Sequence, residues 1–112
     1  MTEADTCREF VTPSLVGAGW GAAESVIGEQ HSFTNGRIIV AGGKGRRGKQ
    51  RRADYLLYYR RDLALAVVEA KEVGLPAETG VQQAREYAEM LGLKFAYATN
   101  GHRIIEIDYT TG

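Results

Sequence analysis

The sequence predicts an α+β fold, layered as a mixed central β-sheet flanked by helices. Two strand-like runs, joined across a charged tip, occupy residues 54–60 and 63–70. Apolar residues at helical spacing follow over 78–91, and two more strand-like runs cover 94–98 and 103–109. A helix that connects two neighbouring strands by a right-handed crossover makes those strands parallel. We therefore expect parallel and antiparallel pairs in one sheet, with helices packed against it.

Length and composition are those of one soluble globular domain. The chain has 112 residues, of which 44% are hydrophobic and 25% charged, and this allows one modest core. No apolar run approaches the roughly 18 residues that span a bilayer, and the N-terminus does not resemble a signal peptide. The single cysteine, Cys7, excludes an internal disulfide and a cysteine-cluster zinc site. We expect a cytoplasmic protein without membrane contact.

The N-terminal segment predicts a helix. Thr2 is suited to the N-cap, with the acid Asp5 three positions on. Pro13 is expected to break or kink this helix near Val11. The alternative is that Thr12 and Pro13 form the cap and first position of a second short helix.

The segment between this helix and residue 54 predicts strands and a loop. A strand is expected over 25–33, weakened by Gly28, and a second one starts at Ile38 after an Asn35-Gly36 turn. Residues 41–52, AGGKGRRGKQRR, contain four glycines and six bases and too few apolar groups to pack. We expect a mobile loop over these residues that orders on a charged ligand.

Positive charge is concentrated in the middle of the chain, although the net charge is zero. Residues 37–61 hold nine of the 14 bases and one of the 14 acids. Such segregation points to a polyanionic partner. A solvated basic loop is the simpler explanation of the same pattern.

Asp54, Glu69 and Lys71 form the pattern D-x14-E-x-K. If the tip closes symmetrically about Arg61 and Asp62, Asp54 lies directly opposite Glu69, on the same face of the sheet. Lys71 lies two residues beyond Glu69 and projects to the same side. Two adjacent carboxylates repel each other, and Mg²⁺ is commonly held by one or two carboxylates with water and phosphate. The alternative is structural, with Asp54 capping the strand and Glu69 and Lys71 forming a half-exposed ion pair.

Gln83 and Tyr87 are four residues apart and share one face of the predicted helix. That face lies beside the apolar stripe, so both side chains are expected to approach the sheet edge that bears the acids. The alternative is a surface glutamine and a half-buried tyrosine.

Several longer stretches match a known family. They are TEADT at 2–6, AGW at 18–20, RRGKQRRADYLLYYRRD at 46–62, AVVEAK at 66–71, the run from Gln82 to His102 with QAREY and ATNG, and IIEIDYTTG at 104–112. The chain resembles the N-terminal nuclease domain of the type I restriction enzyme R (restriction) subunit, a member of the PD-(D/E)xK superfamily. Ala53 stands where the motif's name has proline, and Cys7 stands where we expect arginine.

The resemblance implies a restriction-endonuclease-like core and a Mg²⁺-dependent endodeoxyribonuclease, with residues 1–112 as one nuclease domain of a longer, motor-containing subunit. Asp54 and Glu69 would bind the metal, Lys71 would be the catalytic lysine, and Gln83 and Tyr87 would form the Q-x-x-x-Y motif of this group. Glu3 is the match for an assisting acid on the first helix.

The expected partners are double-stranded DNA and the modification and specificity subunits of an ATP-dependent complex. ATP would be used by the downstream motor, because no P-loop spacing is present in this chain. The expected DNA-contacting residues are Lys44, Arg46, Arg47, Lys49, Arg51 and Arg52. The alternative function is a non-catalytic DNA-binding or subunit-docking module in which the Asp/Glu/Lys cluster is structural.

Overall fold

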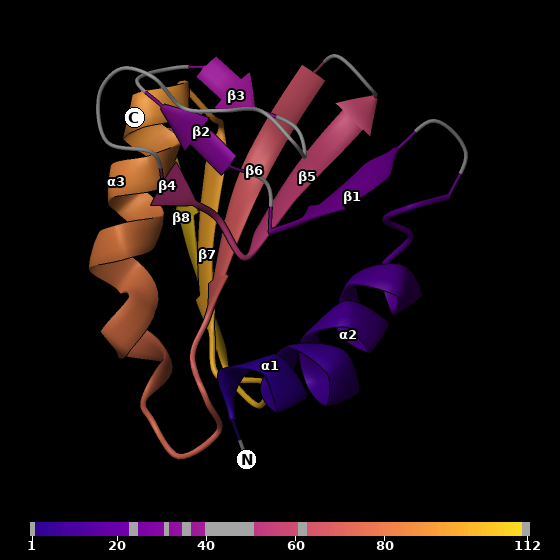
Figure 1. Cartoon of the computed structure of the whole chain (residues 1–112), viewed down its shortest axis with the longest axis vertical. Coiled ribbons are helices and arrows are strands. Elements are labelled where there is room, and N and C mark those ends of the chain that lie inside the picture. The colour runs from indigo at the N-terminus through magenta and orange to yellow at the C-terminus, as the bar shows by residue number, and fades with distance from the viewer. Residues whose placement is uncertain are drawn as a thin grey trace.

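The computed structural model describes residues 2–22, 25–30, 32–34, 37–39, 51–60 and 63–110. Its centre is a five-stranded sheet in the order β1-β5-β6-β7-β8 (Figure 1). The strands are β1 (Val26–Glu29), β5 (Tyr55–Arg60), β6 (Leu63–Ala70), β7 (Phe95–Thr99) and β8 (Ile104–Asp108). β6 and β7 are parallel, and the other neighbours are antiparallel. The predicted mixed sheet and the parallel crossover are confirmed.

Helices cover the two faces of this sheet (Figure 1). The N-terminal helix lies on one face and α3 (Val81–Leu91), entered through the 3-10 turn η2 (Ala77–Gly80), lies on the other. Strand alternation explains the two layers, since Leu56 and Val67 pack with α3 while Leu57 and Val68 pack with the N-terminal helix. In the part of the chain that the structure describes, no helix is long and apolar enough to cross a membrane.

The N-terminal helix is continuous across Pro13. It comprises α1 (Glu3–Thr6), a π-helical segment η1 (Cys7–Val11) and α2 (Thr12–Gly17). The helix does not break near Val11, because Val11 and Thr12 both keep helical backbone angles, but the change from π-helical to α-helical hydrogen bonding falls directly after Val11 and just before Pro13. The second short helix is therefore right in position, but Thr12 does not cap it. Instead, the Thr12 hydroxyl is hydrogen-bonded to the Tyr55 hydroxyl at 2.6 Å.

The single strand predicted over 25–33 is two strands in different sheets. β1 ends at Glu29, and β2 (Ser32–Thr34) pairs with β3 (Arg37–Ile39) and β4 (Arg51–Arg52) in a separate three-stranded sheet. The chain turns at Gln30, whose φ is +57°, whereas Gly28 lies inside β1 opposite Leu56. The β2–β3 pairing confirms the strands around the predicted turn, while the turn residues Asn35 and Gly36 lie outside the described residues.

The basic segment is described only at its C-terminal end. Residues 41–50 lie outside the described part of the chain, and the loop prediction is not addressed there. At Arg51 and Arg52 that prediction is wrong, because these residues pair with Phe33 and Ser32 as strand β4. Backbone hydrogen bonding to the edge of β2 stabilises a strand that has no apolar pattern of its own.

The second half of the chain follows the predicted elements closely. Tyr87 joins Ala84 and Ala88 in the buried face of α3, and Gly92 ends the helix with a left-handed φ of +65°. β7 and β8 follow, joined by a turn at Asn100 and Gly101. The Asn100 carboxamide Oδ1 accepts from the N–H groups of His102 and Arg103, which fixes this turn.

Candidate active site

The sheet register brings Asp54 and Glu69 together. Tyr55 pairs with Val68, so the next step outward places Asp54 opposite Glu69, as predicted. Two hydrogen bonds join this end of the hairpin. The Asp54 N–H donates to Glu69 Oε2 at 3.0 Å, and the Ala70 N–H donates to Asp54 Oδ2 at 2.8 Å. Each carboxylate is therefore held by the backbone of the opposite strand.

Glu69 is an acid in the core of the protein, with 3% of its surface exposed. Burial raises its pKa from 4.5 to about 8, and the charge of Asp54 adds to this shift. The hydrogen bond from the Asp54 N–H and the charge of Lys71 act in the opposite direction. Without a further positive charge, this site favours the protonated form of Glu69 near neutral pH.

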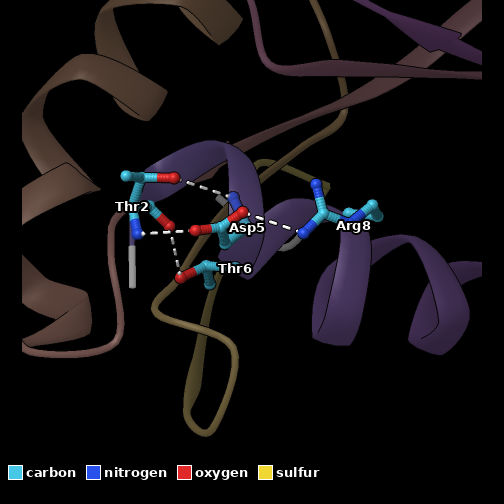
Figure 2. A network of polar contacts seen from close by, with 4 residues as sticks. All are labelled: Thr2, Asp5, Thr6 and Arg8. Atoms are coloured by element: carbon cyan, nitrogen blue, oxygen red, sulfur yellow. Dashed lines mark hydrogen bonds and ion pairs between the residues drawn. The ribbon is translucent and has the colours of Figure 1, made fainter.

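Glu3, in the first turn of α1, lies beside Asp54. Burial raises the pKa of Glu3, followed by the charge of Asp54, while Lys71 lowers it. Both carboxylates line a cavity of about 550 Å³ between α1 and the β1 end, together with Glu29 and Gln30. The helix start that places Glu3 there is a capping box between Thr2 and Asp5 (Figure 2). A third acid therefore lies near the predicted pair.

Lys71 lies beyond the end of β6, on the α3 side of the sheet. Its aliphatic stem packs at Gly80, where a Cβ would lie 3.6 Å from both Cγ and Cε of Lys71. Its N–H donates to the Thr99 carbonyl at 2.8 Å, so the adjacent parallel strand fixes its backbone. The charge of Lys71 lowers the pKa of both Glu69 and Glu3. Among the described residues it forms no ion pair, and the predicted shared side with Glu69 is supported.

Gln83 and Tyr87 lie on one face of α3, where Gln83 Nε2 donates to the Tyr87 hydroxyl at 2.7 Å. Tyr87 is buried rather than half-buried, and its ring meets Phe33 edge-on at 4.8 Å. Burial raises the pKa of Tyr87, and the charge of Glu69 raises it further. We predicted that this helix face approaches the acidic end of the hairpin. The interaction of Tyr87 with the charge of Glu69 supports this prediction.

The donor set suits a hard cation with an incomplete protein shell. Asp54 and Glu69 each use one oxygen on a backbone N–H, which leaves Asp54 Oδ1 and Glu69 Oε1 for other ligands. Gln30 Nε2 approaches Asp54 Oδ1 at 3.3 Å. Among the described residues, no three His, Cys, Asp or Glu side chains form a ready metal cage. Two carboxylates suit Mg²⁺, which keeps several waters and substrate oxygens, better than Zn²⁺.

A second hollow opens between β4 and α3. This cleft has a volume of about 650 Å³ and includes Arg51, Arg52 and Tyr87 in its walls. Arg51 is paired with Glu86 of α3 at 3.6 Å, and Arg52 is exposed. The other predicted DNA-contacting bases, Lys44, Arg46, Arg47 and Lys49, lie outside the described residues.

Comparison with known proteins identifies the family. The family model for the type I restriction enzyme R protein N terminus matches residues 25–112. This chain belongs to that family. As an R-protein N terminus, it is 36% identical over 110 residues to the type I restriction enzyme EcoAI endonuclease subunit of Escherichia coli. That match covers 98% of this chain and 14% of the relative.

The R-protein N-terminal fold is also found in a solved structure. A fragment of a candidate HsdR subunit of a type I restriction enzyme from Vibrio vulnificus YJ016 superimposes with a TM-score of 0.86 at 59% identity. The match covers all of this chain and 22% of that one. The chain thus spans less than a quarter of the length of each of these relatives.

Two residues of this R-protein N terminus escaped the sequence interpretation. Gln30 donates through its backbone to the Asp54 carbonyl at 3.0 Å and approaches the Asp54 carboxylate through its side chain. Glu86 engages Arg51. Neither residue belongs to a spacing pattern. Both contacts depend on strand pairings, β1 with β5 and β2 with β4, that bring distant parts of the chain together.

Proposed function

We propose that this chain is a Mg²⁺-dependent endonuclease domain of the PD-(D/E)xK type, which cleaves DNA phosphodiester bonds within a type I restriction complex. The main support is the pairing of Asp54 with the buried Glu69, whose pKa is raised to about 8. An unrelieved carboxylate pair in a core is costly. A bound cation would take the two oxygens that the backbone N–H groups leave, Asp54 Oδ1 and Glu69 Oε1, and would hold a phosphate oxygen at another of its coordination positions.

In this proposal, Asp54 and Glu69 hold the ion, and Glu3 assists from α1. When bound, Mg²⁺ would lower the pKa of a coordinated water and neutralise the charge that develops on the phosphate. Lys71 contributes a cation that the packing at Gly80 keeps close to Glu69. Its ammonium group would orient the attacking water and would stabilise the negative charge that develops on the hydroxide and the phosphate.

Gln83 and Tyr87 form one wall of the proposed site. The rigid packing of Tyr87 against Phe33 holds the hydroxyl that accepts from Gln83. Because the Gln83 amide donates to Tyr87 with one of its hydrogens, its second hydrogen and its carbonyl oxygen remain available for the substrate. The pair would position the DNA strand rather than take part in proton transfer.

The proposed context is a multisubunit restriction enzyme. The Escherichia coli relative is an endonuclease subunit of a type I restriction enzyme. We infer that this chain makes the break in double-stranded DNA, in company with modification and specificity subunits. ATP would be consumed by a motor outside these 112 residues.

The test separates cutting from DNA transport. Asp54→Ala, Glu69→Ala and Lys71→Ala are introduced into the complete R subunit, assembled with its partner subunits. Each should lower DNA cleavage by about 100-fold or more, the scale of losing a positioned catalytic group, while ATP-driven translocation continues. Glu106→Gln is the matched control, because Glu106 is an exposed acid bonded to Tyr97. Full cleavage by all three variants would refute the nuclease proposal and favour a non-catalytic module.

A further inference from the structure

The cleft between β4 and α3 is lined by groups that can donate hydrogen bonds to a phosphate. Its walls include Arg51 and Arg52 from β4, and Gln82, Gln83, Glu86 and Tyr87 from α3. Guanidinium groups match the geometry of phosphate oxygens, and amide N–H groups complement them. Glu86 is the exception, because its carboxylate repels a phosphate.

Arg51 and Glu86 face each other across this cleft. Their ion pair spans 3.6 Å, with side-chain exposures of 27% for Arg51 and 47% for Glu86. A pair so open to water contributes little to stability. A phosphate that enters the cleft can therefore replace the carboxylate of Glu86 at the guanidinium of Arg51 without a large energetic cost.

The cleft reaches the acidic site through Tyr87. The Tyr87 hydroxyl accepts from Gln83 at 2.7 Å, and both residues line the cleft. Burial, followed by the negative charge of Glu69, raises the pKa of the same hydroxyl. A DNA strand with one phosphate at the carboxylate pair would thus have a neighbouring part of its backbone near Arg51.

We propose that this cleft binds a backbone phosphate of duplex DNA beside the one that is cut. Glu86 acts as a competing carboxylate, which holds Arg51 in the cleft until the DNA phosphate displaces it. The inference rests on the proposed function, because it takes DNA as the substrate. It adds a phosphate site and an acid that weakens it.

The experiment measures binding without chemistry. The 112-residue chain is titrated onto a fluorescent DNA duplex in EDTA at several salt concentrations, and anisotropy gives the dissociation constant. The variants are Glu86→Gln, Arg51→Gln and the double variant. Glu78→Gln is the matched control. Glu78 is also an exposed acid, it lies in the 3-10 turn η2 that precedes α3, and it is paired with Arg103 at 2.9 Å, but it does not line the cleft. Circular dichroism checks that each variant is folded.

Glu86→Gln should bind the duplex about two- to fivefold more tightly, the scale of one exposed charge interaction. Arg51→Gln should bind the duplex more weakly. The slope of the logarithm of the binding constant against the logarithm of the salt concentration should become shallower by about one, which corresponds to the loss of one phosphate contact. The gain from Glu86→Gln should disappear when Arg51 is also replaced. Unchanged or weaker binding by Glu86→Gln, or an equal gain from Glu78→Gln, would overturn the inference.

The same experiment distinguishes this inference from the nuclease proposal. Duplex binding that ignores Arg51 and Glu86 rejects the cleft and leaves the nuclease proposal intact, because cleavage is tested separately at Asp54, Glu69 and Lys71. Absence of duplex binding by the unaltered chain also overturns the cleft inference. If the variants at Asp54, Glu69 and Lys71 all keep full cleavage while the binding experiment gives the expected result, the cleft binds DNA but the module is not catalytic.

Discussion

Asp54 and Glu69 are locked to each other through the backbone. The Asp54 N–H donates to Glu69 Oε2 at 3.0 Å, and the N–H that follows Glu69 donates to Asp54 Oδ2 at 2.8 Å. Because each carboxylate is held by the opposite strand, the two groups cannot rotate apart to relieve their repulsion. The sheet therefore fixes an acid pair whose charge must be offset by a proton or a cation.

The first prediction concerns stability and pH. In the absence of divalent ions, the folded protein holds a proton on Glu69 up to about pH 8, whereas the unfolded chain releases it near the ordinary value of 4.5. The stabilisation of the protonated form is complete below about 4.5 and is lost as the pH rises through about 8, so the free energy of unfolding should decline over this interval. Urea denaturation between these pH limits measures the decline.

Glu69→Gln is the matched variant for that measurement. Glutamine keeps the oxygen that accepts from the Asp54 N–H but cannot ionise. At a pH above 8, we expect this variant to be more stable than the unaltered protein by at least about 1.4 kcal/mol, the equivalent of one pKa unit. Parallel pH profiles for the two proteins would contradict the raised pKa of Glu69.

The second prediction concerns metal binding and protons. At about pH 7, Glu69 is mostly protonated, so an ion that binds its carboxylate must displace the proton. Titration calorimetry with Mn²⁺ in two buffers of different ionisation enthalpy should show release of up to about one proton per ion. Glu69→Gln should release none from this position. Binding without proton release would place the ion away from Glu69.

Local patterns were sufficient to predict the hairpin, α3 and the last two strands. The alternation and helical spacing of apolar residues are properties of short segments. The predicted pairing of Asp54 with Glu69 agrees with the structure, although the strand register shifts on both sides of Tyr58. Most of the candidate site lies on these elements. Its central carboxylate pair was therefore predictable from the sequence.

Pairings between distant segments could not be predicted. Gln30 adopts a positive φ although it is not glycine, and its N–H bonds to the Asp54 carbonyl at 3.0 Å. No local signal marks this turn, because its partner is far along the chain. Arg51 and Arg52 likewise become a strand only because the edge of β2 is available. The separation of β1 from β2 and the cleft beside α3 both depend on such contacts.

The third prediction concerns the start of the N-terminal helix. Thr2 Oγ1 accepts from the Asp5 N–H at 3.1 Å, and Asp5 Oδ2 accepts from the Thr2 N–H at 3.2 Å (Figure 2). Thr2→Ala removes the side-chain acceptor and should cost about 1 kcal/mol in the free energy of unfolding. Thr2→Ser keeps the hydroxyl and should recover most of that loss. Equal destabilisation by both variants would show that the cap contributes nothing.

The last prediction concerns Gly101, which joins the β7–β8 turn to the N-terminal helix. Its φ is +92°, and a Cβ at this position would lie 2.9 Å from Thr6 Cγ2 and 3.1 Å from Phe10 Cβ. Gly101→Ala should therefore destabilise the fold by about 1–3 kcal/mol, from backbone strain and overpacking together. Thermal unfolding measures the loss.

Gly74→Ala is the control for this prediction, because nothing lies within 4 Å of a Cβ there and its φ is not left-handed. This variant should be neutral or slightly stabilising. Thr6, the residue that Gly101→Ala would displace, also accepts from the Val73 N–H at 3.2 Å, shortly after Lys71. The strain should consequently reach the site, and Gly101→Ala should weaken Mn²⁺ binding while Gly74→Ala leaves it unchanged. Equal stability of the two variants would show that the turn can move away from the helix.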